Sequence, residues 1–114
     1  MKDTGIVIAG FGGQGILFLG RTIAYAAMLR GKEVTWFPSY GAEMRGGTAN
    51  CTVVVSDELI GSPVVSEIDI LIVFNEASFN KFLPRLKKDG LLLYDSSMIG
   101  LHESAGANPA LAVD

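Results

Sequence analysis

The sequence predicts an α/β fold in three layers, an open and mostly parallel sheet with helices on both faces. Short runs rich in β-branched residues alternate with segments of helical period. The run "DILIVF" is continuously apolar, as expected for a central strand of a parallel sheet. A glycine-rich turn, "GFGGQG", joins the first apolar run to the first helical segment, and this order makes the predicted sheet Rossmann-like.

The first half of the chain contains a strand, a helix and a second strand. We expect the first strand over 5–10, the helix from Ile16 to Leu29 and the second strand over 32–38. Gly20 lies in the middle of the helix, where glycine costs about 1 kcal/mol relative to alanine. It therefore predicts a close approach of another element, and Gly31 is a natural C-cap.

The first helix is apolar on nearly every side, which indicates burial on both sides. Ile16, Leu19 and Ile23 form one face and would pack on the sheet. The apolar residues of the remaining faces cannot all reach the sheet as well; they are Leu17, Phe18, Tyr25 and Met28. Charged residues make up only 18% of the chain, against about 25% in typical domains. We therefore expect the back of this helix to form an interface with a partner.

The middle of the chain contains a third strand over 50–57 and a fourth over 69–74. No helical pattern separates the second strand from the third, so one of the two is expected to run antiparallel.

The last third of the domain reads as a second helix over 75–90 and a fifth strand over 91–97. Asn75 would cap the start of the helix. Pro84 costs about 3 kcal/mol in a regular helix, so a break is expected at Leu83. We assign residues 1–99 to one domain and expect 100–114 to be a loop or a disordered tail.

Composition limits the class of protein. The 114 residues suit one domain, and a net charge of −3 gives no basic footprint for nucleic acid. No apolar run approaches the ~18–20 residues of a membrane helix, and no signal peptide is recognisable. A single cysteine, Cys51, excludes an internal disulfide. These features indicate a cytoplasmic protein, and no residue set with catalytic or metal-ligating spacing is found.

The first candidate site is the glycine-rich turn, which fits the G-x-G-x-x-G pattern of loops that approach a pyrophosphate. A nicotinamide site would also need an acid at the end of the second strand. "FPSYG" stands there instead, and Glu33 opens that strand rather than closing it. A structural turn, a phosphate site and a dinucleotide site all remain open; the candidate residues are Gly10, Gly12, Gly13, Gln14 and Gly15.

The second candidate site is the loop "GAEMRGGTAN" between the second and third strands. Consecutive glycines can form an anion-binding nest, and Arg45 can hold a phosphate or carboxylate through two hydrogen bonds. A local ion pair between Glu43 and Arg45 is the alternative. Ligands bind at the carboxyl ends of strands in open α/β sheets, so both loops are expected to share one crevice. The candidate residues of this loop are Glu43, Arg45, Gly46, Gly47 and Thr48.

Three separated motifs occur in order: "IVIAGFGGQGILFLG", "GKEVTWFPSYGAEMRGGTANCTVVVSDELIGSPVV" and "FNKFLPRLKKDGLLLYDSS". Together they resemble the gamma subunit of the 2-oxoacid:ferredoxin (acceptor) oxidoreductases, a family that includes the pyruvate and ketoisovalerate enzymes. The stretch "TWFPSYGAEMRGGTANC" is most similar to the 2-oxoglutarate branch. The resemblance covers about residues 4–99. The family continues into further strand and helix, so it implies that this chain is a fragment or a truncated product.

The resemblance implies a role in a multi-subunit enzyme. Such enzymes decarboxylate a 2-oxoacid on thiamine diphosphate, pass electrons through iron–sulfur clusters to ferredoxin and transfer the acyl group to coenzyme A. One cysteine cannot ligate a cluster of the usual four-cysteine kind, and the family's thiamine signature, a GDG followed by Asn, is absent. Alpha, beta and delta subunits are therefore the implied partners and carriers of those cofactors.

For this chain the resemblance implies an assembly module that covers coenzyme A and is inactive alone. Two alternatives remain open, a free-standing NAD(P)-binding protein and a purely structural assembly subunit.

Overall fold

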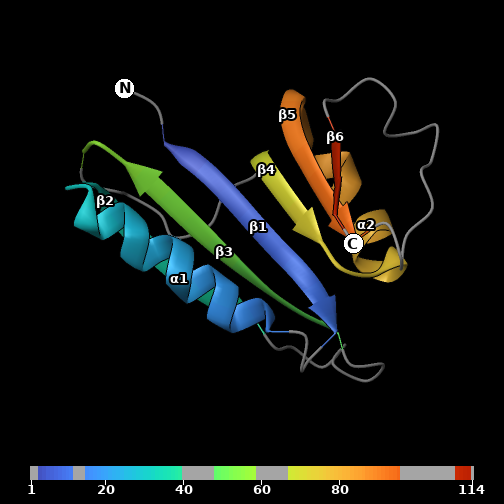
Figure 1. Ribbon diagram of the computed structural model, residues 1–114. Helices are drawn as coiled ribbons and strands as arrows, with labels where there is room; N and C mark the ends of the chain where they lie inside the picture. Colours follow the sequence, from blue (N-terminus) through green and yellow to red (C-terminus); the bar gives the residue numbers. More distant parts are fainter. Residues whose placement is uncertain (1–2, 12–14, 40–47, 59–66, 96–109, 114) are drawn as a thin grey trace.

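The computed structural model describes residues 3–11, 15–39, 48–58, 67–95 and 110–113 (Figure 1). Six strands form one sheet in the order β2-β3-β1-β4-β5-β6. The elements are β1 (Thr4–Phe11), α1 (Ile16–Leu29), β2 (Glu33–Ser39), β3 (Thr48–Ser56), β4 (Ile68–Val73), α2 (Glu76–Phe82), the 3₁₀ turn η2 (Leu83–Arg85), β5 (Leu86–Asp95) and β6 (Ala110–Val113). Within these ranges, none of the helices has the length and apolar character needed to cross a membrane.

The sheet is mixed. Strand β3 runs antiparallel to both of its neighbours, β1 and β2, whereas β1 with β4, β4 with β5 and β5 with β6 pair in parallel. A parallel crossover needs about a dozen or more residues, and the connection from Ser39 to Thr48 is shorter. The prediction that β2 or β3 runs antiparallel is therefore confirmed. The prediction of a mostly parallel sheet is not exact, because two of the five strand pairings are antiparallel.

Helices cover both faces of the sheet, which confirms the three layers (Figure 1). Side chains alternate along β1, so Ile6 and Ile8 face one side and Val7 and Ala9 the other. The first pair packs in a cluster with α1, whose other buried members are Ile16, Ala24, Cys51 and Val53. The second pair packs in a cluster with α2, whose other buried members are Ile68, Leu71, Val73, Phe79, Phe82 and Leu92.

Helix α1 has the bounds that the sequence predicts. A Cβ atom added to Gly20 would lie 2.4 Å from Cys51 Sγ and 2.9 Å from Trp36 Nε1, which confirms the predicted close approach. The helix ends at Leu29, and Gly31 follows the C-cap Arg30. The φ of Gly31, 82°, is in the left-handed region, and its N–H donates to the Met28 carbonyl at 2.9 Å.

The segment after β4 confirms one prediction and corrects another. Asn75 caps α2, and the helix breaks at Leu83 with Pro84 in the 3₁₀ turn, as predicted. The predicted continuation of the helix to Gly90 is wrong, because β5 already begins at Leu86 and pairs there with Ile68. Beyond the proline break, pairing with the buried strand β4 outweighs the local helical pattern of this segment.

The C-terminal tail is also corrected in part. Residues 110–113 form β6, which pairs with β5 in parallel from Leu92 to Asp95. The expectation of a loop or disorder is therefore wrong for these four residues, while 100–109 and 114 lie outside the described residues. The Ala-rich sequence "ALAV" has weak strand propensity of its own, and the open edge of β5 gives it a partner.

The single cysteine is buried in the core, and its burial leads to a testable prediction. Cys51 is fully buried, and its Sγ donates to the Ile16 carbonyl at 3.7 Å. Burial raises the pKa of the Cys51 thiol from 9.0 to about 11, with the Trp36 side chain acting in the opposite direction.

Between these two pKa values the unfolded chain loses a proton that the folded chain keeps, so raising the pH favours unfolding. We expect the free energy of unfolding to fall by roughly 2–3 kcal/mol from about pH 9 to about pH 11 on account of this thiol. Urea unfolding at several pH values, compared between the wild type and Cys51→Ala, measures the effect. The same pH slope in both proteins would contradict it.

Candidate functional site at the carboxyl edge of the sheet

The candidate site lies at one end of the sheet, which we call the carboxyl edge. It is the end where β1, β2, β4, β5 and β6 finish and where the antiparallel β3 begins. The register defines it, because Phe11 pairs with Thr48, Ser39 with Asn50 and Val73 with Tyr94. All the connections that leave these strands for the two helices therefore start at one edge.

Both glycine loops of the sequence analysis are anchored at this edge. Gly10 is near the end of β1, Gly15 is the N-cap of α1 and Thr48 opens β3 directly opposite Phe11. The first loop thus begins where β1 ends, and the second loop ends where the neighbouring strand β3 begins. The strand residues at these two points, Phe11 and Thr48, are paired in the sheet. The other candidates, Gly12, Gly13, Gln14, Glu43, Arg45, Gly46 and Gly47, lie outside the described residues, and their contacts stay a prediction.

The start of α1 is suited to an anion. Gly15 has a φ of 77°, in the left-handed region, and no side chain of the described residues caps the helix. A Cβ atom at Gly15 would meet no atom of the described residues within 4 Å, and the first turn contains no acidic residue. The N–H groups of this turn and the positive end of the helix dipole therefore attract negative charge, by about 0.3–1 kcal/mol when exposed.

Two adjacent parallel strands at the centre of this edge send the chain to opposite faces of the sheet. Strand β1 leads into α1 on one face, and its neighbour β4 leads into α2 on the other. A switch of this kind in the direction of winding, beyond the carboxyl ends of the two strands, is the position at which open α/β sheets generally bind their ligands.

Asn75 follows β4 at this switch point and was missed as a candidate. Its side chain is 3% exposed, and Oδ1 accepts a hydrogen bond from the Ser78 N–H at 2.7 Å. Its Nδ2 has no hydrogen-bond partner among the described residues. Leaving a buried donor unpaired costs about 1–3 kcal/mol, so this N–H group is a candidate contact for a ligand. An asparagine directly after a continuously apolar strand was the available sequence signal, but it was interpreted only as a helix cap.

The geometry argues against a nicotinamide site. Glu33, at the start of β2, pairs with Ser56 at the end of the sheet opposite the carboxyl edge. At about 3.3 Å per residue, the length of β2 keeps this carboxylate roughly 20 Å from the glycine loops. The antiparallel β3 also separates β2 from β1, whereas a dinucleotide fold has those two strands side by side.

The opposite edge is held by charged groups that have a structural role. Asp69 accepts the Gly5 backbone N–H at 2.8 Å and pairs with Lys87 Nζ at 2.8 Å, so it ties β1, β4 and β5 together. This carboxylate raises the pKa of Lys87. Across the described ranges, no group of three His, Cys, Asp or Glu side chains is arranged to hold a metal ion.

Comparison with known proteins gives consistent matches. Residues 5–113 match the family model of pyruvate ferredoxin/flavodoxin oxidoreductase. The chain is 45% identical over 96 residues to the ketoisovalerate oxidoreductase subunit VorA of Methanothermobacter marburgensis, an alignment covering 84% of this chain and 20% of the relative. It is 35% identical over 105 residues to the 2-oxoglutarate synthase subunit KorC of Archaeoglobus fulgidus, which covers 92% of this chain and 56% of KorC.

Two solved structures share the fold. The gamma subunit of a keto/oxoacid ferredoxin oxidoreductase from Geobacter sulfurreducens aligns with a TM-score of 0.82 at 31% identity, covering 98% of this chain and 61% of that one. The 2-oxoglutarate:ferredoxin oxidoreductase of Magnetococcus marinus, solved with 2-oxoglutarate, coenzyme A and succinyl-CoA bound, aligns with a TM-score of 0.86 at 29% identity, covering 99% and 20%. The chain thus spans about a fifth of VorA and about half of KorC.

Proposed function

Because the chain belongs to the pyruvate ferredoxin/flavodoxin oxidoreductase family, we propose that it is the gamma-type domain of a multi-subunit 2-oxoacid:ferredoxin oxidoreductase. The observation that carries this proposal is the match of residues 5–113 to the family model. The complex would convert a 2-oxoacid, coenzyme A and oxidised ferredoxin into acyl-CoA, CO₂ and reduced ferredoxin. This chain would be inactive alone and would assemble with alpha, beta and delta subunits.

We further propose that the carboxyl edge covers coenzyme A within that complex. The support comes from this chain's own residues, namely the uncapped start of α1 at Gly15 and the unpaired N–H donor of Asn75. Both are donors, and they suit the phosphate oxygens of coenzyme A, which are acceptors. Arg45 would add the positive charge, and thiamine diphosphate and the iron–sulfur clusters would be held by the partner subunits.

Reconstitution with and without this chain tests the proposal. We expect the purified complex to reduce ferredoxin when given a 2-oxoacid and coenzyme A, the isolated chain to show no activity, and the complex prepared without it to lose acyl-CoA formation. Full activity in its absence would contradict the proposal.

Two alternatives predict other results. A free-standing NAD(P)-binding protein would show saturable binding of NADH or NADPH by the isolated chain below the millimolar range, measured by calorimetry. A purely structural subunit would tolerate substitution of both glycine loops without any change in the dependence on coenzyme A.

Arg45→Ala in the assembled complex tests the binding role directly. A charge-assisted hydrogen bond contributes about 1.5–3 kcal/mol, so the apparent constant for coenzyme A should rise roughly 10- to 150-fold. The decarboxylation half-reaction, which precedes acyl transfer, should change less. Steady-state kinetics with coenzyme A as the varied substrate measure the first effect, and CO₂ release measures the second.

Arg30→Ala is the matched control, because Arg30 is an exposed arginine at the far end of α1. It should leave the constant for coenzyme A unchanged. If Arg45→Ala instead leaves that constant unchanged while the complex dissociates, Arg45 is an assembly residue and "GFGGQG" is a structural turn.

A further inference from the structure

The outer face of α1 carries a groove that the proposed site does not use. It lies between the helix and the edge strand β2 and has a volume of about 430 Å³. We call it the α1 groove, and the residues that define it here are Phe18, Arg21, Tyr25, Met28 and Trp36.

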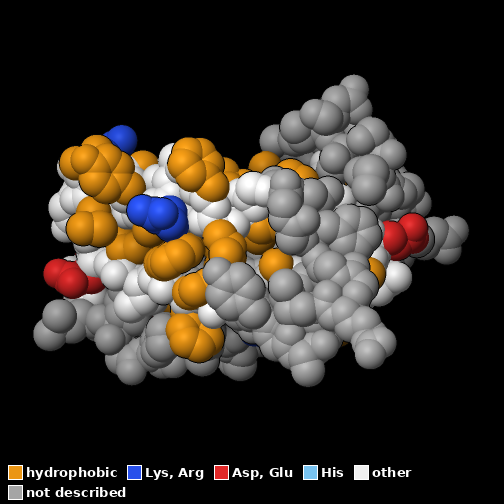
Figure 2. All heavy atoms as spheres, turned by 90° about the horizontal axis from the view of Figure 1, so that it is seen from below, with side chains coloured by type: hydrophobic (Ala, Val, Ile, Leu, Met, Phe, Trp, Pro, Cys, Tyr) orange, Lys and Arg blue, Asp and Glu red, His pale blue; other side chains and the backbone are white. Residues whose placement is uncertain are grey.

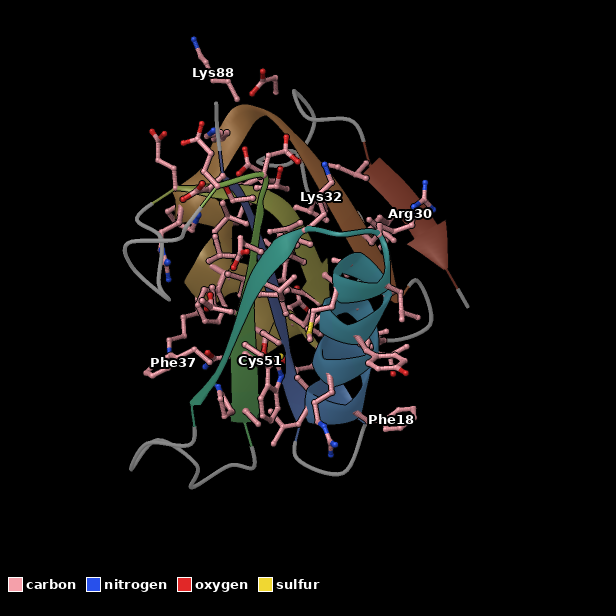
Figure 3. The ribbon with its side chains drawn as sticks, turned by 90° about the vertical axis from the view of Figure 1, so that its left-hand side faces the viewer. Phe18, Arg30, Lys32, Phe37, Cys51 and Lys88 are labelled. Atoms are coloured by element: carbon pink, nitrogen blue, oxygen red, sulfur yellow. The ribbon has the colours of Figure 1, made fainter. Side chains whose placement is uncertain are left out.

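The groove is apolar and open to solvent. Phe18, Tyr25 and Met28 are 73%, 64% and 59% exposed, although they lie along one stripe of a regular helix. Figure 2 shows apolar side chains gathered around a basic one over α1, and in Figure 3 the Phe18 ring points away from the body of the domain. Contiguous exposed apolar side chains of this kind mark an interaction surface. Leu17, which the sequence analysis placed on the same surface, packs instead against the core cluster beneath the helix.

The charge of the groove indicates what kind of partner fits. Arg21 is the only charged residue of α1, and its guanidinium lies 5.9 Å from the centre of the Trp36 ring. The helix contains no acidic residue, and neither do the described residues that line the groove. Arg21 lies midway along the stripe, so a two-fold contact between two copies would bring two arginines together without a counter-charge. A partner with apolar side chains around one carboxylate fits better than a second copy.

The relatives indicate where such a partner comes from. In VorA the matched segment is only 20% of the chain, and in the Magnetococcus marinus oxidoreductase it is also 20%. In both proteins most of the polypeptide is therefore covalently linked to this segment. The covalent link keeps the rest of the polypeptide at a high effective concentration near the segment.

We propose that the α1 groove docks an apolar segment bearing one Asp or Glu, contributed by the larger partner chain of the same oxidoreductase. This inference rests on the proposed function for the identity of the partner. The carboxylate would pair with Arg21 while the apolar side chains cover Phe18, Tyr25 and Met28. Aromatic and arginine side chains of this kind are the residues that dominate binding energy at protein interfaces.

Two neighbouring substitutions test the groove with a matched control. Met28 and Leu29 are adjacent at the end of α1 and similarly exposed, but only Met28 lines the groove. Lysine at either position has the same effect on the helix dipole. We expect Met28→Lys to weaken assembly with the partner chain by at least about 10-fold, as at interface hot spots, and Leu29→Lys to assemble like the wild type. Binding of the purified partner chain to the immobilised domain gives the affinities, and thermal unfolding verifies that both variants fold.

Arg21→Gln tests the carboxylate separately. It should weaken assembly and reduce its dependence on salt, since one charge pair is lost. The proposal would be overturned if Met28→Lys assembled as well as the wild type, or if the two lysine variants lost affinity equally. An unchanged salt dependence in Arg21→Gln would also overturn it. So would a dimer of the isolated wild-type chain, found by light scattering, that Met28→Lys dissociates. A different result would contradict the proposed function, namely a wild-type complex that assembles but forms no acyl-CoA.

Discussion

Gly20→Val is expected to lower the free energy of unfolding by about 3 kcal/mol, the upper part of the usual range for an overpacked core. The first added carbon would stand 2.4 Å from Cys51 Sγ and 2.9 Å from Trp36 Nε1, closer than any van der Waals contact allows. Cys51 is fully buried and cannot move into solvent, so the whole of α1 would have to lift from β3. Urea unfolding followed by circular dichroism measures the change.

Gly20→Ala gives a finer test, because two effects oppose each other. In an exposed helix the substitution would stabilise by about 1 kcal/mol. Here we expect a net loss, and we expect Cys51→Ala to relieve part of it, so that the double variant is more stable than the sum of the two single changes predicts. A stabilised Gly20→Ala protein would show that the helix and the sheet are not in contact at this point.

Phe79→Ala is expected to cost about 3–5 kcal/mol, as for other large aromatic side chains removed from a core. Phe79 is 2% exposed and packs with Val7, Leu71 and Val73 between α2 and the sheet. Its loss would leave a cavity under the helix that Asn75 caps, and the start of that helix would loosen with it.

The same substitution at an exposed phenylalanine is the control. Phe18→Ala, on the outer face of α1, should change the stability of the isolated chain by less than about 0.5 kcal/mol. Calorimetry on both variants compares the two sites. Similar losses at the two positions would mean that the outer face of α1 is packed in the isolated chain, which would contradict the account of the groove as well.

The sequence predicted best where a local signal and the packing agree. The bounds of α1 follow from its apolar period and from Gly31, and the cap at Asn75 follows from the chemistry of its side chain. Gly20 was informative because a glycine inside a helix has a cost that only a close neighbour explains. The short connection after β2 was enough to indicate an antiparallel strand.

The prediction failed where a distant segment decides the structure. The sequence around Lys87 contains no sign that this segment pairs with β4. The helical pattern was therefore extended to Gly90, into residues that form β5. The strand from Ala110 to Val113 likewise depends on the edge of β5 and has little propensity of its own. For the site, the sequence identified two loops whose ends the fold brings to one edge, but it could not show that Asn75 has a hydrogen-bonding group to spare, since that depends on burial.

The central position of β1 has a consequence for the order in which the protein folds. Ile6 must find Ile70, more than sixty residues further along the chain, and Val53 on its other side. Neither flanking contact is local, so two long loops must close before the central strand is paired on both sides. Closing them costs conformational entropy before the pairing stabilises the chain. Until β4 has been synthesised, this very apolar strand has an unpaired edge, the kind of edge on which chains aggregate. The folding rate of this domain should therefore depend on the β1–β4 pairing more than on the formation of α1, however readily that helix forms.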